Sequence, residues 1–197
     1  MNIKRLFLLL LGGILTIVLW QCTNDLGTSP APAILRVYLV TNPADTTIRI
    51  GFDTLTVTHS DQFALTIGQM KVYSNDSIYA RLFSDFSGYR DEEKEYNLLQ
   101  RDADSFVPQK IAETYIPPKS YQAIEFVVYP PKQVTIHGLT FPIEIPDGYQ
   151  PLIRMDCPFV AQSHDEYAIY IRFDAFKSIK RWRDTYMFTP YFEIINK

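Results

Sequence analysis

The chain has 197 residues, of which 47% are hydrophobic, 14% aromatic and 21% charged, and its formal charge is −3. This length predicts one domain, or two small ones. The aromatic content is sufficient for a packed core and excludes wholesale disorder. The net negative charge removes the usual electrostatic argument for nucleic-acid binding, which needs a basic face.

The N-terminus has the layout of an export signal. Lys4 and Arg5 precede an apolar run from Leu6 to Trp20. As a helix this run would extend about 22 Å, which is shorter than the roughly 30 Å of a bilayer core. We therefore predict a signal peptide over residues 1–21.

Cys22 follows this run after Gln21, and Leu19 precedes the cysteine by three positions. The segment LWQC resembles the lipobox of bacterial lipoproteins, in which the cysteine is thioether-linked to diacylglycerol and becomes the new N-terminus. The resemblance implies that fatty acyl chains such as palmitate on Cys22 attach the protein to a membrane, and about two membrane signals suffice for stable anchoring. An ordinary secretory signal and an uncleaved anchor are the alternatives.

The next residues have almost nothing to bury and contain Pro30 and Pro32. We expect residues 22–33 to be a flexible tether and residues 34–197 to form the folded domain. Cys157 is the only cysteine besides Cys22. If Cys22 is acylated, Cys157 has no disulfide partner and is expected to be buried as a small hydrophobic residue.

Beyond the tether, apolar residues recur with a period close to two. The alternation starts in residues 34–40 and continues in residues 47–52, where Ile48, Ile50 and Phe52 are expected to share one face. It runs through residues 63–73, in which Gly68 suggests a β-bulge. The later segments with the same period are residues 121–129, 167–173 and 186–195. About eight to ten strands predict an all-β fold, a single antiparallel β-sandwich of the immunoglobulin or prealbumin kind.

One segment departs from this period. Asp174 can cap the first turn of a short helix over residues 175–182, because Phe176 and Ile179 have helical spacing. Asp174 and Ser178 could also be an acid and a nucleophile, but no histidine is tied to either residue. We interpret Asp174 and Ser178 as a structural motif.

Four segments together resemble a known family. They are IPPKSYQAIEF from Ile116, the stretch from Gly138 to Ile143, YAIYIRFDAFKSI from Tyr167, and YMFTP from Tyr186. They are similar to a widespread bacterial family of exported lipoprotein domains that is classed as a domain of unknown function, with the patterns f-D-a-x-x-S-i and y-x-l-x-P. The resemblance covers about residues 35–195. It implies a β-rich, sandwich-like domain outside the cytoplasm and no activity that could be carried over.

The leader, the tether and the fold favour a non-enzymatic binding or structural module of the bacterial cell envelope, anchored by lipid on the periplasmic or outer face of a membrane. Its partner would be a protein or a glycan, and no cofactor or metal is predicted. Surface aromatic residues could stack on sugars or contact a protein. The candidate ligand-binding aromatics are Tyr89, Tyr96, Trp182 and Tyr186.

The alternative is an envelope hydrolase whose site combines loop histidines with carboxylates. The candidates are His59, His137 and His164. None of them stands in a metal-binding pair, and the chain has no Gly-x-Ser-x-Gly elbow. Two histidines that meet on a carboxylate in a cleft would favour the hydrolase.

Overall fold

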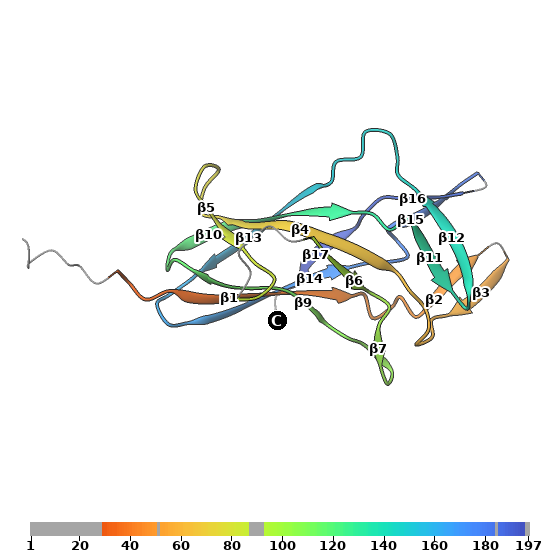
Figure 1. Cartoon of the computed structure of the whole chain (residues 1–197), viewed down its shortest axis with the longest axis horizontal. Helices are drawn as coiled ribbons and strands as arrows, with labels where there is room; N and C mark the ends of the chain where they lie inside the picture. The colour runs from red at the N-terminus through yellow and green to blue at the C-terminus, as the bar shows by residue number, and fades with distance from the viewer. Residues whose placement is uncertain (1–28, 51, 87–92, 184, 196–197) are drawn as a thin grey trace, which may run out of the picture. The chain divides into compact units, whose positions relative to one another are not determined.

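The computed structural model describes residues 29–50, 52–86, 93–183 and 185–195 (Figure 1). Residues 31–197 form one compact unit. The described part of the chain is all-β, with seventeen strands, several of them only two to four residues long. It contains no helix that is long and apolar enough to cross a bilayer.

The first sheet has four strands in the order β17-β14-β1-β9. Its central strand β1 pairs in parallel with β14 and antiparallel with β9. Every second side chain of β1 is buried, as the period of two predicted. The strands are β1 (Ala33–Thr41), β9 (Gln109–Ile116), β14 (Glu166–Phe173) and β17 (Phe192–Ile195).

The second sheet has five strands. Its order is β13-β10-β4-β5, and β6 pairs with the first half of β4 while β5 pairs with the second half. All of these pairs are antiparallel. The strands are β4 (Ala64–Tyr73), β5 (Tyr79–Leu82), β6 (Lys94–Asn97), β10 (Ser120–Tyr129) and β13 (Leu152–Val160).

The bulge that the sequence suggested at Gly68 is present in β4. Gly68 pairs with Val127 and Lys71 pairs with Glu125, so two residues of β4 lie opposite Phe126. The first of these two, Gln69, has a φ of +46° and an exposed side chain. The extra residue shifts the alternation by one, so that Met70 and Val72 bury on the same side as Leu65 and Ile67.

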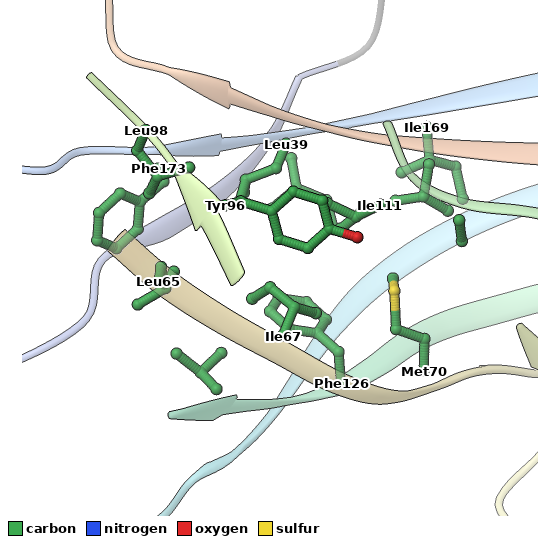
Figure 2. Packing of buried hydrophobic residues seen from close by; sticks show 14 of the residues in the cluster. Leu39, Leu65, Ile67, Met70, Tyr96, Leu98, Ile111, Phe126, Ile169 and Phe173 are labelled. Carbon is green, nitrogen blue, oxygen red and sulfur yellow. The ribbon is translucent and has the colours of Figure 1, made fainter. Parts of the chain in front are cut away.

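Side chains of both sheets meet in one hydrophobic core. Figure 2 shows part of it, with Leu39 and Ile169 from the first sheet close to Ile67 and Phe126 from the second. Aromatic contacts cross between the sheets, since the rings of Phe126 on β10 and Phe192 on β17 meet edge to face at 5.3 Å. The two sheets therefore share the burial that stabilises each of them.

The remaining strands form a third sheet and two hairpins. The third sheet has the order β11-β12-β16-β15, and its β12–β16 pair is parallel. Its strands are β11 (Gln133–Ile136), β12 (Leu139–Glu144), β15 (Ile179–Trp182) and β16 (Thr185–Phe188). The hairpins are β2 (Thr47–Ile50) with β3 (Asp53–Thr56), and β7 (Arg101–Asp102) with β8 (Ser105–Phe106).

The helix predicted near residues 175–182 is wrong. Residues 175–178 form a turn, and residues 179–182 form β15, which pairs antiparallel with β16 from Ile179↔Phe188 onward. Asp174 does cap this turn, because its Oδ1 accepts the backbone N–H of Lys177 at 2.9 Å. Residues 179–182 form a strand because pairing with β16 gives them cross-strand hydrogen bonds and packing, which outweigh the local helical spacing.

Two further expectations need correction. The fold is not purely antiparallel, since the β1–β14 and β12–β16 pairs are parallel. The alternation of buried and exposed residues is the same in parallel and antiparallel pairs, so it does not predict the relative direction of two paired strands. Phe52 does not continue the face of Ile48 and Ile50, because it lies in the turn between β2 and β3 with 97% of its surface exposed.

Candidate functional site

The structure places the aromatic residues selected from the sequence in different environments. Tyr89 lies outside the described residues, as does the lipidation candidate Cys22. Tyr96 on β6 is only 6% exposed, and burial raises its pKa to about 12. This position corrects the expectation for Tyr96, because a ring packed in the core is not available to a ligand at the surface.

The other two aromatics lie on the β15–β16 hairpin. Tyr186 is half-buried and meets Phe141 of β12 edge to face at 5.9 Å. Trp182 is 56% exposed at the end of β15. Of the four selected residues, Trp182 is thus the one whose ring is both described and open to solvent.

Cys157 on β13 is a free, buried cysteine. Burial raises the pKa of its thiol to about 11, because the charged thiolate is poorly solvated there. The thiol is therefore almost entirely protonated at neutral pH and behaves as the small hydrophobic residue that the sequence predicted.

Asp174 and Ser178 organise the turn that follows β14. The Ser178 hydroxyl donates to the backbone carbonyl of Asp174 at 2.6 Å and accepts the backbone N–H of Tyr191 at 2.9 Å. Asp45, from the β1–β2 connection, accepts the N–H of Ala175 at 2.6 Å. These bonds join three distant segments of the chain and leave the Ser178 oxygen occupied by the backbone.

Asp45 and Asp174 form a close carboxyl pair. Burial and the charge of Asp174 raise the pKa of Asp45 to about 7. Asn42 donates from its side chain to Asp174 at 3.0 Å and ties the β1–β2 connection to the same turn. At pH 7 Asp45 is therefore protonated in about half of the folded molecules, whereas an unfolded aspartate is almost fully ionised.

The pair predicts a pH dependence of stability. The folded pKa of Asp45 lies above its unfolded value, so folding takes up a proton between about pH 4 and pH 7, and stability is lost as the pH rises through this range. Asp45→Asn mimics the protonated acid. We expect its stability relative to wild type to be greater at pH 8 than at pH 5 by about 2 kcal/mol, because only wild-type folding depends on the Asp45 proton. Denaturant titrations at both pH values measure the difference, and parallel pH profiles for the two proteins would contradict the assignment.

The three histidines lie in three separate turns. The His137 ring bonds to the backbone carbonyl of Thr56, and His137 reaches the buried carboxylate of Asp61 through its backbone N–H at 2.7 Å. His59 is exposed in the turn before β4, and His164 lies in the turn between β13 and β14. No two imidazole rings are bonded to a common carboxylate among the described residues, so this geometry does not favour the hydrolase.

A groove of about 650 Å³ lies between β4, β6 and the β10–β11 connection. Its one aromatic side chain is Tyr129, at the end of β10, which is 36% exposed. The Tyr129 hydroxyl is hydrogen-bonded to Glu93, and this bond raises the pKa of Tyr129 above its ordinary value. The lining residues are Gln62, Ala64, Thr66, Glu93, Glu95, Tyr129, Pro130, Pro131, Lys132, Gln133 and Thr135.

The fold explains why these side chains converge. Glu93 and Glu95 are two positions apart along an extended segment, so both point to the same side. The bridge Gln62↔Thr135 brings β11 beside the start of β4, and both residues line the groove. The sequence analysis selected none of these residues, because they come from segments that are far apart in the chain. The available signal was a tyrosine at a strand end, directly before Pro130-Pro131.

The groove supplies carboxylates, amides and hydroxyls around one aromatic ring, a set suited to a ligand rich in hydroxyl groups. In the described part of the chain, no cluster of three or more histidine, cysteine, aspartate or glutamate side chains could hold a metal ion.

Comparison with known proteins identifies the family. No curated protein matches the chain. No solved structure matches it either. The family model described as a domain of unknown function (DUF4382) matches residues 33–190, from the first residue of β1 to Pro190 after β16. Because this match covers most of the sequence and nearly all of the folded unit, the chain belongs to the DUF4382 family.

Proposed function

We propose that this chain is a lipid-anchored protein of the bacterial cell envelope whose β-sandwich domain is a non-enzymatic binding module for a glycan. The leader, the cysteine at position 22 and the proline-containing tether support the anchor. Two sheets that share one core support a sandwich of the immunoglobulin or prealbumin kind.

The observation that carries the binding function is the groove at Tyr129. The face of an exposed tyrosine ring can stack on the apolar face of a sugar, while surrounding amides and carboxylates accept and donate hydrogen bonds to its hydroxyls. Glu93 and Glu95 outweigh the single cation Lys132, so the groove repels anions. A neutral or amino-bearing oligosaccharide fits this chemistry better than an acidic one.

The groove is tested by titrating the full chain with neutral chito-oligosaccharides and, as the acidic comparison, with a polyuronate. We expect binding of the neutral sugar alone, weakened about 10-fold by Tyr129→Ala through the loss of stacking. Tyr115→Ala is the matched control, since Tyr115 is a 57% exposed tyrosine on β9 that does not line the groove. Equal effects of the two variants, or a protein ligand that still binds Tyr129→Ala, would contradict the assignment.

The anchor has a separate test. Cells that express the chain are labelled with palmitate and fractionated, and Cys22→Ala is compared with Cys157→Ala. We expect label and membrane attachment to be lost only in Cys22→Ala, because the thioether needs the side chain at position 22. A labelled Cys22→Ala chain, or an unlabelled wild-type chain, would refute lipidation without affecting the groove.

A further inference from the structure

The β15–β16 hairpin carries a concentration of positive charge that contrasts with the acidic chain. Residues 177–188 contain four cations, Lys177, Lys180, Arg181 and Arg183, and the single acid Asp184, whereas the whole chain has a formal charge of −3. Among the described residues, no ion pair involves Lys180, Arg181 or Arg183. These charges are therefore available to a partner.

An exposed tryptophan lies within this positive cluster. Trp182 is the last residue of β15, pairs with Thr185 beside the turn and is 56% exposed. The guanidinium of Arg183 lies 5.9 Å from the centre of its ring. An exposed tryptophan next to cationic side chains combines an apolar ring with positive charge, which suits the interfacial zone of a membrane.

A second hairpin adds an apolar side chain at the same end of the domain. Phe52, between β2 and β3, is 97% exposed, the largest fraction among the exposed large hydrophobic residues. The bodies of the two hairpins are packed together, since Ile50 of β2 and Ile179 of β15 line one apolar crevice. In Figure 1 both tips lie at the right-hand end, opposite the start of β1 at Ala33.

We propose that the tips of the β2–β3 and β15–β16 hairpins form a docking surface for an anionic phospholipid membrane. Trp182 and Phe52 enter the headgroup region, and Lys180, Arg181 and Arg183 bind lipid phosphates. The charge complementarity selects an anionic surface. The shape selects a membrane over an acidic glycan, because both rings stand on hairpin tips and neither lines the groove or the crevice.

This docking surface is independent of the glycan groove and of acylation at Cys22. Exposed aromatic rings are costly in water, so covering them stabilises the bound state, while the cations supply attraction that salt screens. The two contributions can be separated by substituting the cations and Phe52 individually.

Trp182 itself provides the reporter. The chain has only two tryptophans, Trp20 and Trp182, so a full chain carrying Trp20→Phe emits from Trp182 alone. Vesicles of phosphatidylglycerol with phosphatidylethanolamine should shift this emission to the blue, and brominated acyl chains should quench it. Phosphatidylcholine vesicles should do neither. The leader contributes no tryptophan emission in this variant, because its one tryptophan has been replaced.

Two variants and a matched control measure the contributions. Lys180→Ala/Arg181→Ala should raise the anionic lipid concentration for half-maximal shift by about 30-fold, and Phe52→Ala should raise it by about 10-fold. Lys94→Ala/Lys110→Ala, which removes two exposed cations elsewhere that do not line the groove, should change it less than about 3-fold. The inference is overturned if anionic vesicles leave the emission unchanged, if both double variants act equally, or if only a soluble polyuronate shifts the emission, which would assign an acidic glycan instead.

Discussion

Replacing Phe173 with alanine is expected to lower the free energy of unfolding by about 3–5 kcal/mol. Phe173 is fully buried at the end of β14, where its ring contacts Phe63 at 5.5 Å and Phe192 at 4.9 Å. Phe192 in turn contacts Phe126 of the second sheet. Phe173→Ala would remove the ring that links these contacts and leave a cavity that close-packed neighbours fill only in part.

Urea denaturation of the full chain measures this loss, and Phe52→Ala is the matched control. Phe52 is 97% exposed, so the same chemical change there should alter the free energy of unfolding by less than about 0.5 kcal/mol. Similar losses in the two variants would show that Phe173 is not packed in a shared core.

Asp61→Ala is expected to cost about 2–4 kcal/mol. Asp61 is fully buried, and its two carboxylate oxygens accept the backbone N–H groups of Thr58 and His137, each at 2.7 Å. These bonds hold the turn before β4 against the β11–β12 turn. Removing the carboxylate leaves two N–H groups without their acceptors, and hydrogen bonds to a charged group are worth more than neutral ones.

The comparison for this variant is Asp76→Ala. Asp76 pairs with Arg154 at 2.7 Å, but its side chain is 93% exposed. An exposed ion pair contributes little, so we expect a loss below about 1 kcal/mol from thermal or urea unfolding. A larger loss for Asp76→Ala than for Asp61→Ala would refute the role assigned to the buried carboxylate.

Local patterns in the sequence were sufficient to assign the long strands that bury one face. The alternation in residues 34–40 and the glycine at position 68 identified β1 and the bulge in β4, because the side-chain period of a strand is a property of neighbouring residues. Short strands such as β7 and β8 were missed, since two residues carry no measurable period.

In the segment after Asp174, local patterns did not predict the secondary structure correctly. Its spacing suited a helix and its capping residue was assigned correctly, yet residues 179–182 form a strand because β16 pairs with them. Strand partners and the direction of each pair depend on segments far apart in the chain. For the same reason the parallel β1–β14 pair was not expected.

Among the candidate sites, too, one residue could be selected from the sequence and one site could not. The sequence alone offered Trp182 as one of four candidate aromatics, since residue type is visible without a fold, but its exposure came from the structure. The groove was not visible, because Glu95, Tyr129 and Gln133 come from different segments and become neighbours only when β6, β10 and β11 assemble.

By itself, then, the sequence determined the all-β class, the leader's resemblance to a lipoprotein signal and the alternation that buries one face of each long strand. Only the tertiary structure decided which strands pair, which carboxyl groups lie close together and where the groove forms. The physical reason is that burial patterns arise from residues one or two positions apart, whereas a site is made by contacts between segments whose separation along the chain carries no local signal.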